Sequence, residues 1–178
     1  MSELIGPVYA AKDYAGFIRR TAALLLDFAI LVAVLAAIVF GWSFLTSHGF
    51  VRPPTYSRVV QVWMVLAAAY MLGFRLLPNG TPGYRLVGIR YAYMMGERPS
   101  YLWILGRSLW AVFMFWLLGL DHLWILIDKR KQAWHDKLSG FYVVKRNAVP
   151  IGTERIVRRV IGVLGYAMVV WEPAADNT

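Results

Sequence analysis

One carboxylate stands inside the first long apolar run of the chain. The run covers residues 16–45, and after Arg19 and Arg20 at its start, Asp27 is the only ionisable residue before His48. In a helix that crosses lipid, such an acid lies below the headgroups, where charged groups are rare, costly and mostly functional. The sequence therefore predicts that Asp27 faces the interior of a helix bundle, where it meets a cation or takes up a proton.

Two arginines are candidate partners of this acid. Arg20 lies seven positions before Asp27, which is about 20 degrees around a helix and about 10.5 Å along its axis, so a direct bridge is marginal. Arg107 lies a few residues into a later apolar region, and we predict that it is the counter-charge. Two roles are open for these charges. They form a static network that holds helices in register, or Asp27 is a protonatable or cation-binding group on a translocation path.

Histidine and aspartate occur side by side twice in the second half of the chain. Asp121 and His122 fall inside an apolar region and need polar partners, for which we expect structural hydrogen bonds, with a proton relay as the alternative. His135 and Asp136 follow a basic run at 129–131 that is typical of a topology determinant. Because neither a nucleophile nor a metal-ligand spacing completes a site around them, we predict no enzyme, no metal and no cofactor.

The composition favours a membrane protein. Of the 178 residues, 59% are hydrophobic and only 16% are charged, and the apolar residues gather in long runs. The net charge of +9 flanks these runs and does not form one basic face with stacking aromatics. This pattern favours anionic lipid headgroups as partners and argues against nucleic acid. The chain has no cysteine, which excludes disulfides and thiolate metal sites.

The apolar runs predict an all-α multi-pass membrane protein with a small cytoplasmic β element. Residues 16–45 and 59–77 are long enough for two full transmembrane helices, the first uncleaved. The third apolar region, residues 101–127, is broken at Gly119. We predict a re-entrant hairpin bent at this glycine, with a third span as the alternative. Small residues on the second helix allow close helix packing, which is compatible with a homo-oligomer.

The segments outside these helices are predicted as follows. Residues 1–15 are a polar lead without clear structure, and residues 80–83 are a turn. Residues 84–93 alternate as a strand does, and a second short strand is expected at 140–145. The chain accordingly divides into a lead at 1–15, a membrane domain at 16–145 and a tail at 146–178. Residues 154–171 of the tail predict an interfacial amphipathic helix, with a short fourth span as the alternative.

The distribution of basic residues predicts the topology. Lysine and arginine number three before the first helix, two in the first loop, four between residues 75 and 98, and nine between residues 129 and 159. The positive-inside rule therefore places the N-terminus, the second loop and the C-terminal tail in the cytoplasm. Two full crossings satisfy this arrangement.

Four motifs in order resemble the RDD family of small bacterial membrane proteins. They are Arg20-Thr-Ala-Ala-Leu-Leu-Leu-Asp27, Gly80-Thr-Pro-Gly83-Tyr-Arg85-Leu-Val-Gly-Ile-Arg90, Arg107, and Arg130-Lys-Gln-Ala-Trp-His135-Asp136-Lys-Leu-Ser-Gly140, within residues 14–145. The family is named for one arginine and two aspartates. The resemblance implies that these are Arg20, Asp27 and Asp136.

The sequence departs from the family pattern at Tyr84, where a lysine is common, and at Trp134, where a smaller residue is usual. The resemblance implies a location in the bacterial inner membrane. It says more about the expected architecture than about the activity. Two functions stay open. One is transport or cation and proton exchange through Asp27, which has been suggested for the family. The other is a non-catalytic scaffold or accessory protein whose charges only assemble the helices.

Overall fold

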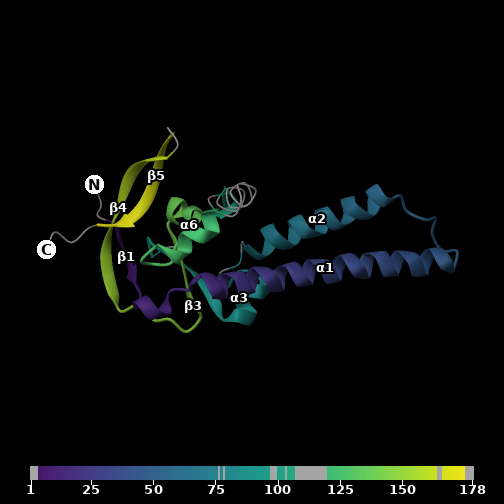
Figure 1. The fold of residues 1–178 in the computed structure, drawn as a ribbon, viewed down its shortest axis with the longest axis horizontal. Helices are drawn as coiled ribbons and strands as arrows, with labels where there is room; N and C mark the ends of the chain where they lie inside the picture. The colour runs from purple at the N-terminus through teal and green to yellow at the C-terminus, as the bar shows by residue number, and fades with distance from the viewer. Residues whose placement is uncertain are drawn as a thin grey trace.

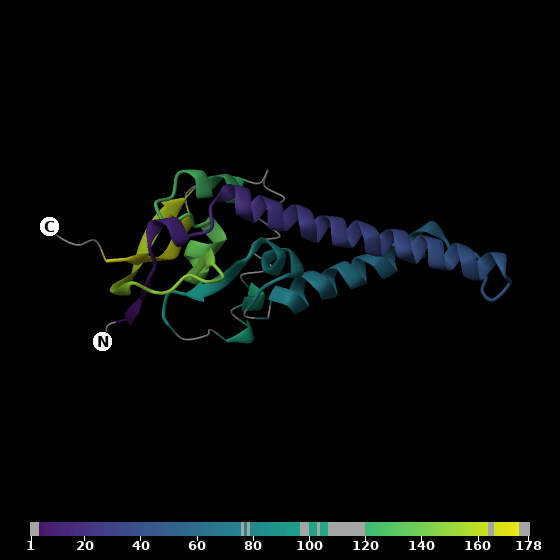
Figure 2. The ribbon, with the colours of Figure 1, turned by 90° about the horizontal axis from the view of Figure 1, so that it is seen from below.

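Two long helices form a hairpin that projects from a smaller body of strands and short helices (Figure 1). The computed structural model describes residues 4–75, 77, 79–96, 100–102, 104–106, 120–163 and 166–174. Arg107 and the bend predicted at Gly119 lie outside these residues. The first and last strands lie at the end of the molecule opposite the hairpin tip (Figure 2).

The hairpin consists of α1 (Phe17–Ser47) and α2 (Tyr56–Arg75), which confirms the two predicted long helices. At 1.5 Å per residue they are about 46 Å and about 30 Å long. From Phe28 to the tip, no residue of α1 is buried, and none of α2 is buried either. Both helices are long and apolar enough to cross a bilayer. Such unpacked apolar surfaces are stable where lipid covers them.

A short helix, α3 (Pro82–Val87), follows α2 and packs against the first turns of α1. Thr81 caps its N-terminus, Pro82 starts it, and Gly88 ends it with a φ of 71°. These residues are typical of helix ends. Thr accepts a hydrogen bond from a free backbone N–H, Pro fits the first turn and Gly adopts the left-handed conformation. The prediction of a turn at 80–83 and of a strand beginning at 84 is therefore wrong.

The strand at this place is shorter than predicted. β2 (Ile89–Tyr93) pairs antiparallel with β3 (Phe141–Lys145), with Tyr91 opposite Val143. The second strand predicted at 140–145 is confirmed. Residues 141–144 are all at most 1% exposed, so β3 is the centre of the body. A strand buried on both faces is apolar without alternation, as this one is.

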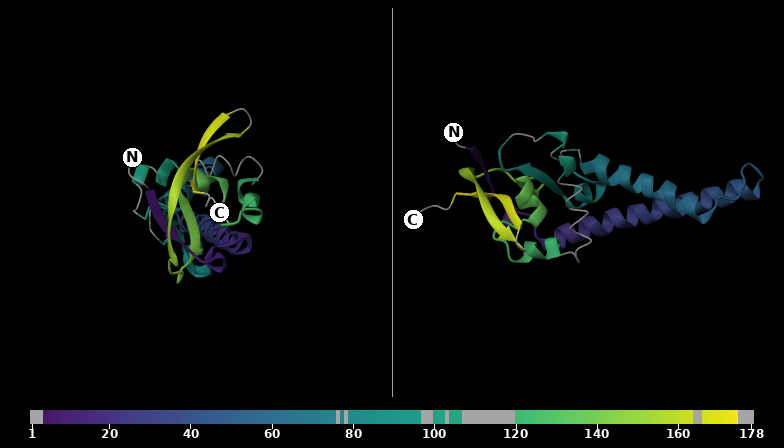
Figure 3. Two further views of the ribbon diagram at one scale, coloured as in Figure 1. Left: turned by 90° about the vertical axis from the view of Figure 1, so that its left-hand side faces the viewer. Right: turned by 90° about the horizontal axis from the view of Figure 1, so that it is seen from above.

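A second sheet is formed by the two ends of the chain. β1 (Leu4–Val8), β4 (Gly152–Val163) and β5 (Tyr166–Pro173) pair antiparallel in the order β1-β4-β5. Figure 3 shows β4 and β5 as a long curved hairpin. The predictions of an unstructured lead at 1–15 and of an interfacial helix or fourth span at 154–171 are both wrong. The tail is rich in β-branched residues, which favour strands.

The apolar interior of the body consists of two clusters, and both sheets contribute to one of them. Tyr14 stacks edge-on against Tyr142 of β3 at 5.4 Å, and Trp171 of β5 and Ile156 of β4 bury their side chains in the same cluster. Five strands lie in the described residues, so the all-α prediction is wrong and the fold is α+β with a helical hairpin. Short helices complete the body: η1 (Ala11–Asp13), α5 (Leu120–Leu123), η2 (Trp124–Leu126) and α6 (Trp134–Ser139).

Candidate functional site

The carboxylate of Asp27 accepts three hydrogen bonds from two other elements. Tyr70 of α2 donates its hydroxyl at 2.7 Å and the Gly83 N–H donates at 2.8 Å, both to Oδ1. Thr81, the cap of α3, donates its hydroxyl to Oδ2 at 2.5 Å. Asp27 is 3% exposed. The buried acid is therefore held by three neutral hydrogen-bond donors.

Arg107, the cation predicted to meet Asp27, lies outside the described residues, so this pairing stays a prediction. Arg20 contacts other groups, and no cationic side chain within the described ranges contacts the acid. The sequence missed Tyr70, Thr81 and Gly83 as partners. A signal for Thr81 was present, because Thr followed by Pro is typical of a helix start, whose free N–H groups attract an acid.

Glycine at position 83 allows α3 to approach α1 closely. A Cβ at this position would lie 2.2 Å from the carbonyl oxygen of Ala23 and 2.8 Å from the carboxyl carbon of Asp27. Any side chain would therefore push α3 away from α1 and break the hydrogen bonds to the acid.

Arg20 belongs to a separate buried cluster, seven residues closer to the start of α1 than Asp27. Its Nη1 forms an ion pair with Asp136 of α6, and its Nε and Nη2 donate to the carbonyl oxygens of Ala15 at 3.0 Å and Lys131 at 2.6 Å. Lys131 has a left-handed backbone with a φ of 55°. The side chains of Arg20 and Asp136 are 2% and 0% exposed. The basic run at 129–131 thus also supplies a backbone acceptor.

His135 lies between two carboxylates. Its Nδ1 is 2.5 Å from Asp121 and its Nε2 is 3.2 Å from Asp136. The backbone N–H of His135 also donates to Asp121 at 2.9 Å. Because both ring nitrogens face acceptors, the doubly protonated imidazolium is the form that donates to both. In that form, Asp121, His135, Asp136 and Arg20 are a row of alternating negative and positive charges.

Asp121 is the acidic end of this row. Burial acts to raise the pKa of Asp121, but the hydrogen bonds and charge of His135 outweigh burial, so the pKa is lowered. His122 lies outside the row, with its Nε2 3.3 Å from the hydroxyl of Thr21 on α1. Burial and the nearby Arg20 lower the pKa of His122, so the neutral imidazole is favoured.

The RDD family model matches residues 14–140. The chain belongs to the RDD family. Neither a curated protein nor a solved structure matches it. Family membership and the two apolar helices together indicate a membrane location. The resemblance seen in the sequence is confirmed.

The RDD match covers the residues of both clusters, but it ends before β3. The elements after residue 140 nevertheless complete the interior of this RDD protein. Arg130 donates to the Tyr142 hydroxyl at 3.0 Å and pairs with Glu154 of β4. Burial raises the pKa of Tyr142. This link was not predicted from the sequence, because it joins the family region to the tail.

The predicted residues of this RDD protein therefore fall into two sets. Arg20 and Asp136 meet directly, with His135 and Asp121 beside them, and Asp27 lies seven residues further along the same face of α1. Arg107 lies outside the described residues. Within those ranges, no group of three His, Asp or Glu side chains has the geometry of a metal site. The contacts of Arg20, Asp121 and His122 can hold α1, α5 and α6 together. The imidazoles of His135 and His122 are the groups in this arrangement that can take up a proton.

Proposed function

We propose that this RDD protein is a non-catalytic membrane scaffold or accessory protein. The α1–α2 hairpin anchors it in the bilayer, and the charged residues attach the α+β body rigidly to the hairpin. The observation that supports this most strongly is that the buried Asp27 accepts hydrogen bonds from Tyr70, Thr81 and Gly83. An acid that accepts a proton and releases it along a path needs access to water, whereas this one is 3% exposed and held by three donors.

The depth of Asp27 also favours the structural role. Its partner Tyr70 lies five residues before Arg75, the last residue of α2, which is about 7.5 Å along the helix. Asp27 is thus near the end of the span where the body attaches. The segment of α1 from residue 28 to residue 47 has 20 positions, about 30 Å, and matches α2 in length.

The proposed location is the bacterial inner membrane, with the body and both chain ends in the cytoplasm. This orientation rests on the positive-inside rule, because the body carries most of the lysine and arginine. The connection at the hairpin tip has only Arg52 and Arg58.

Anionic lipids around the base of the hairpin and a second copy of the chain are the proposed partners. Ala68, Ala69 and Gly73 lie exposed on α2 and offer a small-residue surface for another helix. An RDD dimer built through this surface would bring two bodies side by side at the membrane, as an assembly platform requires.

A flux measurement separates the scaffold from a transporter. Purified protein in liposomes that contain a pH-sensitive dye is exposed to a sodium or potassium gradient. The scaffold predicts the same proton flux as in protein-free liposomes, for the native chain and for Asp27→Asn alike. Cation-driven flux that Asp27→Asn abolishes would overturn the proposal. Tyr70→Phe is the matched control, because it removes one hydrogen bond from Asp27 and leaves the charge.

A further inference from the structure

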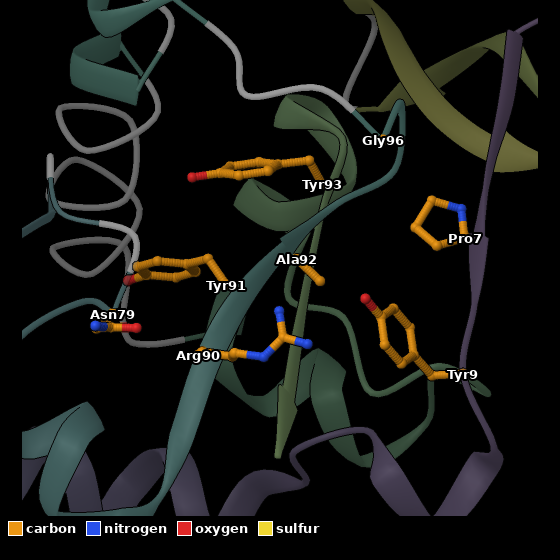
Figure 4. Close-up of a pocket in the computed structure, with 8 residues that line it drawn as sticks. All are labelled: Pro7, Tyr9, Asn79, Arg90, Tyr91, Ala92, Tyr93 and Gly96. Carbon is orange, nitrogen blue, oxygen red and sulfur yellow. The ribbon is translucent and has the colours of Figure 1, made fainter. Parts of the chain in front are cut away.

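A pocket of about 270 Å³ lies between β1 and β2, away from both charge clusters (Figure 4). Its lining includes Pro7 and Tyr9 from the N-terminal segment and Arg90 to Tyr93 from β2, with Asn79 and Gly96 at its borders. Figure 4 shows Tyr9 and Arg90 on the same side of β2, pointing into the space between the two strands. None of these lining residues is acidic.

The guanidinium of Arg90 is fixed but not neutralised. Its Nε donates to the carbonyl oxygen of Arg146 at 3.1 Å, and its Nη2 donates to that of Ala148 at 3.0 Å. Within the described chain, Nη1 has no acceptor and no carboxylate pairs with this arginine. Two carbonyl dipoles hold the group in place and leave a full positive charge with free donors at the pocket.

The hydroxyl of Tyr9 is a second free donor at the same place. Tyr9 is only 6% exposed, and its ring packs edge-on against Tyr14 at 6.2 Å. Among the described residues, no acceptor meets its hydroxyl, although buried tyrosine hydroxyls normally have a partner. Since Tyr9 lines the pocket and its hydroxyl is not enclosed by the described residues, the hydroxyl can donate to a ligand atom there.

We propose that this pocket binds a phosphate group through Arg90 and Tyr9. A guanidinium with free donors is suited to phosphate oxygens, and a tyrosine hydroxyl adds a neutral donor to the same anion. None of the described lining residues carries a negative charge that would repel an anion. The volume accepts a phosphate ester with a small polar group attached.

The position of the pocket connects it with the membrane. Asn79 lies four residues beyond Arg75, where α2 ends and the chain leaves the predicted span. The phosphate of an anionic lipid headgroup is thus one source of the ligand, and a soluble phosphate ester is the other. This is a defined site, in contrast to the diffuse attraction of basic residues for the membrane surface.

Two binding measurements on the full chain distinguish these sources. In the first, the protein is placed in nanodiscs of phosphatidylcholine with a minor fraction of phosphatidylglycerol, and the retained phosphatidylglycerol is measured by native mass spectrometry. In the second, glycerol phosphate is titrated by calorimetry into protein in phosphatidylcholine discs. Both are carried out with the native chain, Tyr9→Phe, Arg90→Gln and the control Arg19→Gln. The control removes the same charge from an exposed site near the membrane.

The native chain is expected to bind one of the two ligands, and Tyr9→Phe and Arg90→Gln are each expected to weaken that binding at least about tenfold. Arg19→Gln should change it less than twofold. Retained phosphatidylglycerol without glycerol phosphate binding identifies a lipid headgroup, and the reverse identifies a soluble ester. Binding of neither ligand, or equal losses in all three variants, would overturn the proposal. Tyr9→Phe keeps the ring, and its thermal unfolding midpoint verifies that the fold is intact.

Discussion

The guanidinium of Arg20 forms a buried ion pair with the carboxylate of Asp136, which lies 116 residues further along the chain. The pair joins the start of α1 to α6, so it attaches the membrane hairpin to the body. Because Arg20 also donates to two carbonyl oxygens, each of its three side-chain nitrogens has an acceptor, and these contacts compensate the cost of burying the charge.

Removing one member of this pair should destabilise the protein strongly. Arg20→Met removes the guanidinium that pairs with the buried Asp136, and we expect a loss of about 3–5 kcal/mol in the free energy of unfolding. The measurement is denaturant unfolding in detergent micelles, with the double variant Arg20→Met/Asp136→Leu completing the cycle. The double variant should lose less than the sum of the two single losses. Additive losses would show that the two side chains act independently.

The close approach of α3 to α1 predicts a specific response to one added methyl group. In Gly83→Ala, the new Cβ clashes with the carbonyl oxygen of Ala23, so we expect a loss of about 1–3 kcal/mol in unfolding free energy. Gly73→Ala on α2 is the control, because a Cβ there meets nothing within 4 Å. The control should be neutral or slightly stabilising. Equal losses in both variants would contradict the packing of α3.

Stability should depend on pH through His122. The folded state lowers the pKa of this imidazole below its usual 6.5, so the unfolded chain binds a proton more readily. Stability is therefore full above about pH 6.5 and falls as the pH drops from 6.5 towards the folded-state pKa. The measurement is the unfolding midpoint at several pH values. As the pH drops, the midpoint of His122→Gln should fall less steeply than that of the native chain. His48→Gln, at the exposed end of α1, should not differ from native.

The proposed orientation predicts opposite labelling at the two ends of the hairpin. The chain has no cysteine, so His48→Cys at the tip and Asn147→Cys on the body each provide one thiol at an exposed position. In intact cells, a membrane-impermeant maleimide should label His48→Cys and should label Asn147→Cys only after the membrane is opened. Labelling of both positions in intact cells would contradict the assignment of the body to the cytoplasm.

The tail beyond the RDD match should be required for folding. Trp171 of β5 is 4% exposed in the interior beside Tyr142, and we expect Trp171→Ala to cost about 3–5 kcal/mol. Tyr56→Ala, at an 85% exposed position on α2, is the control and should change stability little. Thermal unfolding of the two variants provides the comparison. A tail that behaves as an independent interfacial element would make both changes neutral.

The sequence by itself determined the two long helices, whose formation depends on the surrounding lipid. Residues 17–47 and 56–75 form helices because long, predominantly apolar runs must satisfy their backbone internally in lipid, and that rule needs no tertiary partner. The sequence also identified Arg20, Asp27 and Asp136 through the order of the RDD motifs. β3 was correctly predicted, because a short β-branched apolar run bounded by glycine is a local signal.

Only the tertiary structure decided which partners these residues have. Asp27 was predicted to meet a cation or to take up a proton, and the sequence did not show that the tight packing allowed by Gly83 places α3 on it, where neutral donors form hydrogen bonds to it. The ends of the chain were predicted as a loose lead and a helix, yet β1 and β4 pair across about 150 residues, and pairing at that distance leaves no local pattern. The hydrophobic run of the tail fits a helix or a strand equally well, and the neighbouring strand decides between them.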